Sequence, residues 1–451
     1  MNSSNPKLKR SLGLKALMAT GICSMLGASI NVVPFMIHRS VPGIDSYVLP
    51  AFIFAMLPAF FAALAYGILS SAMPRAGGSY IYASRGLNPY FGFIASFSQW
   101  FGLSIVIGVI AYICVSFIRD VVIGLGFTEA ALLFELPTVK ISISIALIWL
   151  FVFVNIRGAS MYKKTLLPMM YLMFVLGFAV IISGFYFDTS DFVAALQAKE
   201  SKVINIDQIS RFDWRVFLSA SALLFSSFIG FDSIAQAGSE AKNPTKTLPK
   251  AIVLAIFSVG CFYFLFTTAV YHTVPWSFVA EESKLRDISA PGLLNYVLPS
   301  WLGVAIVLGA AIALINDLPA MLLSVSRLMF AWAEDGIFPS AISKVHPTNH
   351  TPYVALIVAG VMASIGSLGS QFAGDFFLGI DIMVTSMMVN FFLMCVTLLT
   401  IPKINPQLAS NISVIKKRNY QVAIGVVGVL LLSLFLAINI NRNKKKNNKK
   451  N

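Results

Sequence analysis

Apolar stretches recur along the whole chain, separated by short polar segments. Each is close to the roughly 20 residues that an α-helix needs to cross the hydrocarbon core of a bilayer. The stretches are continuously apolar and do not alternate with polar residues, which excludes a transmembrane β-barrel. The pattern predicts eleven spans, at residues 12–37, 46–72, 91–118, 141–156, 164–187, 214–237, 248–274, 297–332, 352–370, 376–401 and 421–440.

Composition agrees with this pattern. Of the 451 residues, 57% are hydrophobic and only 12% are charged, whereas soluble domains carry about 25% charged residues. The net charge of +14 lies mostly in short loops and the C-terminal tail, so we expect the lipid bilayer and not nucleic acid as the partner. The four cysteines all lie inside spans without metal-ligand spacing, so no metal is expected. The sequence predicts an all-α polytopic membrane protein.

The basic residues also predict an orientation. With a cytoplasmic N-terminus, about twice as many Lys and Arg residues fall on the cytoplasmic side as on the other. We therefore expect an integral membrane protein with a cytoplasmic N-terminus, and we place it in the bacterial inner (plasma) membrane. One feature conflicts with this orientation, because after eleven spans the basic tail 441–451 would emerge outside. Either the eleventh span does not cross fully, or the core fixes the topology before the tail can influence it.

The first span is interrupted by small residues at its midpoint. Residues 21–30 read GICSMLGASI, where a membrane helix would normally carry large apolar residues. Small residues can serve close helix packing. They can also mark an unwound backbone, which lipid tolerates only where the backbone lines a cavity or is buried in protein.

The sixth span has a matching interruption, and this favours the second interpretation. Its midpoint carries Ser226, Ser227, Gly230, Asp232 and Ser233. Interrupted helices at corresponding positions of two halves are typical of transporters built from inverted repeats. A broken helix exposes free N–H groups at one end and free C=O groups at the other. Together these groups suit a zwitterion without any buried charged side chain.

Three further segments resemble one family of transporters. They are SSAMPRAGGSYIYASRGLNP (70–89), FIGFDSIAQAGSEAKNPTKTLPKAI (228–252) and SRLMFAWAEDGIFPSAISKVHPTNHTP (326–352). Their Pro-Arg-x-Gly-Gly-x-Tyr, Glu-x-Lys-Asn-Pro and Asp-Gly-x-x-Pro motifs closely resemble those of the amino acid–polyamine–organocation (APC) superfamily permeases, in the amino acid permease branch. The three motifs occur in order and cover spans one to nine.

The resemblance implies a fold like that of the sodium-coupled leucine transporters, a 5+5 inverted repeat with broken helices 1 and 6. The ten-helix core would occupy residues 9–401, with one repeat at about 12–187 and the other at about 214–401. Residues 402–451 would form an accessory eleventh span and a basic tail. The function implied is secondary active transport of amino acids by alternating access.

The matching motifs also imply substrate-binding positions on the backbone of both breaks. The substrate carboxylate would be received by Gly27, Ala28 and Ser29, and the ammonium group by Ser227, Phe228 and Ile229 with Met25. Gly230 would let span six unwind. The chain departs from the family pattern at Ser29, where a glycine is usual, and at Asn31, where an apolar residue is usual. Both side chains could add hydrogen bonds near the substrate, or face a water-filled vestibule.

Acidic residues at membrane depth are costly and commonly functional. Asp232, in the break of span six, is either a coupling or gating carboxylate or a structural acceptor for free N–H groups. Asp317 lies ten residues before Arg327, roughly 15 Å along a helix. It could bind a cationic substrate, carry a coupling proton, or be a structural acid. Asp381, near the start of span ten, could face outside water, so a structural role is preferred for it.

Charged residues near the cytoplasmic ends offer candidates for an inner gate. Glu240, Lys242 and Arg327 are candidates for its ion pairs, although ordinary loop charge would explain them equally well.

The transport mechanism is left partly open by the sequence. Span five carries no Lys after Lys164, so a lysine in place of a sodium ion is not supported. We expect a proton rather than sodium as the coupling ion, with either symport or exchange. A polyamine or cationic amino acid/amine antiporter is the alternative. The chain shows no convergent catalytic cluster and no phosphate-binding Walker A motif, so we expect neither an enzyme nor a cofactor.

Overall fold

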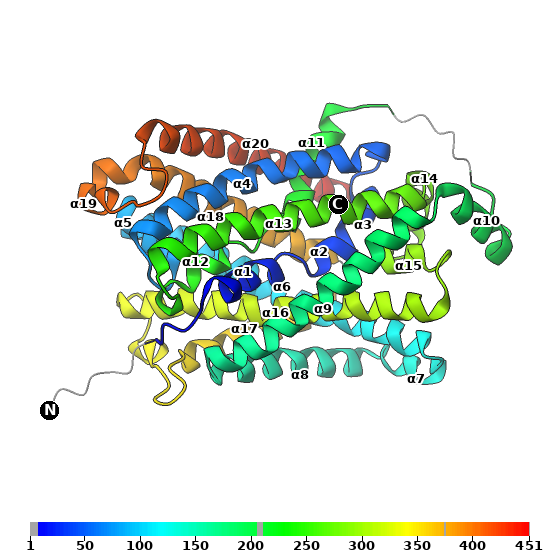
Figure 1. Cartoon of the computed structure of the whole chain (residues 1–451), viewed down its shortest axis with the longest axis horizontal. Helices are drawn as coiled ribbons and strands as arrows, with labels where there is room; N and C mark the ends of the chain where they lie inside the picture. Colours follow the sequence, from blue (N-terminus) through cyan, green and yellow to red (C-terminus); the bar gives the residue numbers. More distant parts are fainter. Residues whose placement is uncertain (1–7, 205–210, 374–375, 451) are drawn as a thin grey trace.

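The computed structural model describes residues 8–204, 211–373 and 376–450. Long helices run side by side along the longest axis of the molecule (Figure 1). Within these ranges the only β-type pairing consists of two isolated bridges, Leu12 with Ala241 and Ala76 with Ala237. The prediction of an all-α polytopic protein is confirmed.

Ten helices are long and apolar enough to cross a membrane in the described part of the chain. They are α4 (Val48–Ala72), α6 (Pro89–Gly124), α8 (Pro137–Ile156), α9 (Ala159–Tyr186), α11 (Trp214–Leu224) with its continuation to Gln236, α13 (Pro244–Thr273), α16 (Ser300–Glu334), α17 (Tyr353–Ala373), α18 (Phe376–Ile404) and α20 (Arg418–Lys450). Each coincides with one of the predicted spans two to eleven.

The first predicted span is a broken helix. It consists of α1 (Leu14–Cys23), α2 (Ala28–Asn31) and α3 (Val33–Ser40). The gap at residues 24–27 falls inside the segment that was expected to unwind. A second interruption at Val32 was not predicted from the sequence.

The sixth span is broken at the expected place as well. After α11 the chain forms the short 3-10 helix η2 (Phe225–Phe228), leaves helical geometry at Ile229, and continues as α12 (Ser233–Gln236) and η3 (Gly238–Glu240). In the most apolar 18-residue segment of this span, 89% of the segment is buried, whereas in the corresponding segment of α9 the buried share is 28%. The broken helix therefore lies at the centre of the bundle, and α9 lies at its surface.

Short helices connect the spans, and none of them is long enough to appear as a span-length apolar stretch in the sequence. They are η1 (Asp45–Tyr47), α5 (Gly78–Gly86), α7 (Thr128–Leu133), α10 (Thr189–Glu200), α14 (Trp276–Leu285), α15 (Ala290–Leu294), η4 (Ser340–Ser343) and α19 (Pro406–Ser410).

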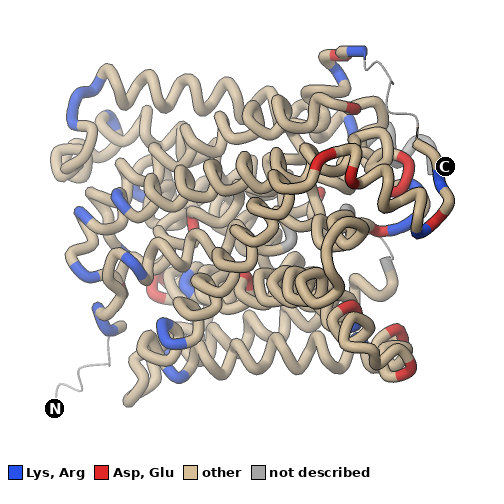
Figure 2. The backbone as a smooth tube through the Cα atoms, turned by 45° about the vertical axis from the view of Figure 1, so that its right-hand side comes forward, with Lys and Arg blue, Asp and Glu red and all other residues tan. Residues whose placement is uncertain are grey.

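The two chain ends lie at opposite ends of the bundle. Lys and Arg gather at the end that carries the N-terminus, and most Asp and Glu lie at the other (Figure 2). Helix α20 runs unbroken along α18 and α4, so the eleventh span extends along the bundle. Its Arg442 forms a buried ion pair with Asp381. Asp381 does not face water, because α20 covers it and leaves it 6% exposed. Its ion pair agrees with the structural role that the sequence favoured.

The Gly-Gly motif of residues 77 and 78 allows close contact between chain segments at the N-terminal end. Gly77 has a φ of +73°, and a Cβ there would lie 2.3 Å from the Ala331 Cβ. A Cβ on Gly78 would lie 2.8 Å from the Ala235 carbonyl oxygen. Glycine is required because any side chain would push apart the loop, the broken helix and α16.

The Asp-Gly motif at the end of α16 has an electrostatic role. The Asp335 carboxylate accepts hydrogen bonds from Arg85 at 2.7 Å and from the Tyr80 hydroxyl at 2.8 Å. Burial alone would raise the pKa of Asp335, but these two contacts outweigh it, and the pKa is lowered. The charged carboxylate thus joins α5 to the end of α16.

We expect Asp335→Asn to lower stability by about 0.5–1 kcal/mol near neutral pH. Because the pKa is depressed in the folded state, the stabilisation is present above the unfolded-state pKa of about 3.9 and is lost as the pH falls through the folded value. Thermal unfolding in detergent at several pH values measures this effect, and Asp287→Asn at an exposed ion pair is the control. If the loss of stability in Asp335→Asn stayed the same at acid pH, the charge of the Asp335 carboxylate would not be its source.

Candidate functional site

The two helix breaks are in direct contact. Gly230 has a φ of +138°, and a Cβ there would lie 2.4 Å from the Ser24 carbonyl oxygen. The hydroxyls of Ser24 and Ser233 are 3.2 Å apart, within hydrogen-bonding distance. The first and sixth spans therefore meet where both leave helical geometry, and only a glycine at 230 permits this approach.

A small cavity lies beside this contact. Its free volume is about 20 Å³, slightly more than the roughly 10–15 Å³ that one water molecule needs. It is lined from both breaks and from α6, α16 and α18 by Ser24, Ser29, Val33, Val106, Ile110, Ser226, Ile229, Asp317, Met321, Ile380 and Met383. Three serines and one aspartate thus line a mostly aliphatic space.

The carboxylate of Asp317 lies directly against the first break. A Cβ on Gly27 would lie 1.7 Å from the Asp317 Oδ2 and 2.2 Å from its Cγ. Asp317 is 2% exposed. The absence of a side chain at Gly27 therefore admits this acid to the backbone that was predicted to receive the substrate carboxylate.

Tyr263 of α13 supports the unwound backbone of the first break. Its hydroxyl donates a hydrogen bond to the Met25 carbonyl oxygen. Its ring packs at 5.6 Å from that of Phe228 and at 5.2 Å from that of Phe52. Tyr263 was not predicted from the sequence, because one tyrosine within an apolar span carries no distinguishing pattern.

Two serines of the second break have buried hydroxyls. Neither the Ser226 Oγ nor the Ser227 Oγ has a hydrogen-bond partner within the described ranges. Only Ser226 lines the cavity, together with its neighbour Ile229. Buried hydroxyls without partners are destabilising, which is consistent with a site that binds a polar ligand.

Asp232 belongs to a separate polar network. Its carboxylate accepts hydrogen bonds from the Gln99 side chain and from the Gly230 backbone N–H at 3.1 Å. The Gln99 amide oxygen in turn accepts from Gln236 at 3.0 Å and from Ser79. Asp232 thus acts as an acceptor for the broken backbone, one of the two roles that the sequence allowed, and a coupling role stays a prediction.

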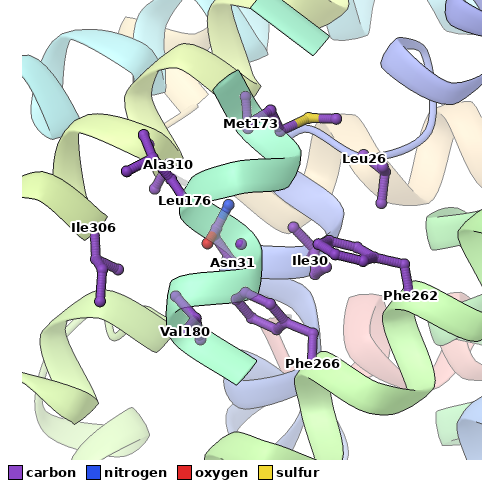
Figure 3. A pocket seen from close by; sticks show the side chains of 13 residues that line it. Leu26, Ile30, Asn31, Met173, Leu176, Val180, Phe262, Phe266, Ile306 and Ala310 are labelled. Atoms are coloured by element: carbon purple, nitrogen blue, oxygen red, sulfur yellow. The ribbon is translucent and has the colours of Figure 1, made fainter. Parts of the chain in front are cut away.

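Asn31 lies away from the cavity that holds Asp317. It lines a second cavity of about 20 Å³ between α2, α9, α13 and α16. Figure 3 shows its side chain close to Leu176 and Val180 of α9, in otherwise apolar surroundings. The structure therefore places the two departures from the family pattern on different cavities, since Ser29 lines the first. Of Ala28, only its place as the first residue of α2 is described.

A buried ion pair lies at the N-terminal end of the bundle. The Arg327 Nε lies 2.7 Å from the Glu240 Oε1, and both side chains are at most 3% exposed. The Glu240 carbonyl oxygen also accepts hydrogen bonds from the backbone of Ser11 and Leu12, each at 2.9 Å. The predicted pairing of Glu240 with Arg327 is confirmed, while Lys242 is exposed.

Sequence comparison agrees with this geometry. Residues 12–451 match the family described as amino acid permease. The chain belongs to this family. The resemblance that was derived from the three motifs is thereby confirmed, and the many apolar helices make this family member an integral membrane protein.

Several relatives of this permease carry descriptive names. It is 26% identical over 389 residues to the "Branched-chain amino acid permease BcaP" of Bacillus subtilis, covering 81% of this chain and 76% of the relative. It is 25% identical over 376 residues to the "Cationic amino acid transporter 4" of Mus musculus, covering 81% of this chain and 56% of that relative. The permease thus spans only about half the length of the mouse protein. A third relative, "Uncharacterized transporter Mb2022c" of Mycobacterium bovis, is 26% identical over 80% of this chain and 74% of its own length.

Proposed function

We propose that this permease is a secondary active transporter that moves amino acids across the membrane by alternating access. The observation that carries the proposal is the contact of the two broken helices at Gly230 and Ser24, beside a cavity lined by hydroxyls and one carboxylate. Discontinuous helices that meet near mid-membrane are the usual substrate site of such transporters. The relatives named for branched-chain and cationic amino acids support amino acids as the substrate class.

The proposed substrate site spans both breaks. The backbone at Gly27, Ala28 and Ser29 receives the substrate carboxylate, and carbonyl groups around Ser227 and Ile229 receive its ammonium group. Hydrogen bonds to both charged groups replace their lost hydration without a cationic side chain. The aliphatic lining of the cavity supports a substrate with an apolar side chain.

Alternating access is supported by how tightly the cavity is closed. A free volume of about 20 Å³ is too small for an amino acid, so the surrounding helices must move to admit one. The buried pair of Glu240 and Arg327 is the proposed gate at the N-terminal end. We place this end in the cytoplasm because Lys and Arg gather there (Figure 2). The relatives from Bacillus subtilis and Mycobacterium bovis support a bacterial plasma membrane as the location.

Proton coupling, as symport or exchange, completes the proposal. Asp232 and Asp317 are buried carboxylates at the centre of the bundle, and buried carboxylates commonly carry protons in transporters. The alternative is a polyamine or cationic amino acid/amine antiporter. The position of Asp317 in the cavity favours that alternative, because a carboxylate there attracts an ammonium group.

Transport by the purified protein in liposomes tests the proposal. We expect labelled branched-chain or cationic amino acids to accumulate when an inward proton gradient is imposed, or to exchange against unlabelled substrate inside. Gly230→Ala should reduce the rate at least tenfold, because its Cβ would separate the two breaks. Gly369→Ala is the matched control, because a Cβ there meets no atom within 4 Å.

Two other transport results would contradict the proposed function. If a broad panel of amino acids and amines moved under neither proton nor sodium gradients, the proposed function would be rejected. If only amines moved, and only by exchange, the antiporter alternative would replace it.

A further inference from the structure

We propose that Asp317 competes with the substrate carboxylate for the same backbone, so that an amino acid binds only when Asp317 takes up one proton. This inference rests on the proposed function, since it assumes a substrate with a free carboxylate. It assigns the coupling proton to one residue and gives a physical reason why substrate and proton bind together.

Asp317 lies directly against Gly27 of the first break. Its carboxylate occupies the space directly above Gly27, where even a Cβ would lie 1.7 Å from the Oδ2. Asp317 also lines the cavity, so a substrate carboxylate that approached Gly27 on this side would meet the Asp317 oxygens. The two carboxylates therefore cannot both keep these positions.

Neutral titratable groups lie close to Asp317. Cys23 of α1, Cys114 of α6 and Tyr263 of α13 are titratable groups close enough to Asp317 to interact with its charge. Thiols and phenols are neutral near pH 7. None of the three offsets a second negative charge, and two carboxylates that share one site cannot both ionise.

Ser226 offers a hydrogen-bond acceptor for the protonated side chain of Asp317. The Ser226 hydroxyl is 2% exposed, lines the cavity with Asp317, and has no partner in the described residues. When a proton from the aqueous phase neutralises one Asp317 oxygen, the resulting carboxyl O–H can donate to a cavity hydroxyl such as this one. The Gly27 backbone is then free for the substrate carboxylate, and no other bond changes.

A consequence separates amino acids from amines. An amine without a carboxylate would pair with charged Asp317 and need no proton. The amino acid and its decarboxylated amine should therefore show opposite pH dependence at the same site. We expect amino acid affinity to fall about tenfold per pH unit above the Asp317 pKa, while amine affinity does not fall in that range.

The test uses the purified full-length protein with leucine and its decarboxylated counterpart, isoamylamine, from about pH 5 to about pH 9, where perturbed carboxylates titrate. In wild-type protein in weak buffer, leucine binding should take up about one proton per molecule at a pH where Asp317 is charged. Isoamylamine binding should take up none. This measurement needs no variant, so it stands even if substitutions prevent folding.

Two isosteric variants complete the test. Asp317→Asn should bind leucine with no pH dependence and without proton uptake, and should lose isoamylamine binding. Asp287→Asn, which changes an exposed ion pair that does not line the cavity, is the matched control and should keep the wild-type pH slope. Proton uptake that persists in Asp317→Asn would overturn the inference, as would leucine binding without uptake at every pH. If no amino acid binds at all, the proposed function itself fails, which is a different result.

Discussion

Gly27→Ala is expected to abolish substrate transport, with a rate reduction of at least tenfold. The added Cβ would lie 1.7 Å from the Asp317 Oδ2, far inside contact distance, so the whole carboxylate must leave its position. Forcing extra volume into a packed interior costs about 1–3 kcal/mol. The displaced carboxylate would also occupy the small cavity beside both breaks. Uptake of labelled amino acid in liposomes, together with thermal unfolding in detergent, measures both effects.

A double-mutant cycle shows whether Asp317 is the cause. Asp317→Ala removes the atoms that the new Cβ would meet, so Gly27→Ala should cost less stability in that background, with a coupling of about 0.5–3 kcal/mol. Gly369→Ala, where a Cβ meets no atom within 4 Å, controls for the loss of glycine. Full transport by Gly27→Ala would reject the assignment of Gly27 to the substrate carboxylate.

Arg327→Gln is expected to produce the largest loss of stability among single changes at the N-terminal end. It leaves Glu240, which is 3% exposed at its side chain, without its cationic partner. Removing one member of a buried ion pair costs about 3–5 kcal/mol, because the remaining charge is buried and uncompensated. Thermal unfolding of the purified protein measures this loss. Transport should also change, because the pair joins the broken sixth span to α16.

Neutralising both partners tests the electrostatic explanation. The double variant Glu240→Gln, Arg327→Gln should recover much of the stability that Arg327→Gln loses, because no uncompensated charge is left. Arg39→Gln is the control, since its ion pair with Asp287 is largely exposed and is worth at most about 1 kcal/mol. If the stability losses of the two single variants simply added up in the double variant, the ion pair would not be the source of the loss in Arg327→Gln.

The broken helices show how far the sequence pattern reached. The segment 21–30 predicted a break, and the gap at residues 24–27 lies inside it, because small residues stabilise a membrane helix too weakly to keep it continuous. The interruption at Val32 was not predicted, although the sequence carries a local signal for it. Val32 is the N-cap of α3, and Pro34 follows at the second position of that helix. A proline has no backbone N–H to continue the preceding helix and is favoured in the first turn of a new one.

The candidate site shows the same division. Ser29, Ile229 and Asp317 were selected from the sequence, and the structure brings them to one cavity. Asn31 was selected by the same reasoning and lies on another cavity. Each residue along a helix turns the side-chain direction by about 100°, since 3.6 residues make a turn. Asn31 lies two residues after Ser29 in the short helix α2, so their side chains point to different neighbours.

By itself, the sequence determined the membrane class, the eleven spans, the two breaks and the family. These follow from local properties, namely apolar length, small residues and short motifs, and local properties can be read along the chain. Only the tertiary structure decided that Asp317 lies against Gly27, that Tyr263 holds the Met25 carbonyl, and that α20 covers Asp381. Each of these contacts joins residues from different helices. Their rotations and depths are set by how all the helices pack together, which no single stretch of sequence encodes.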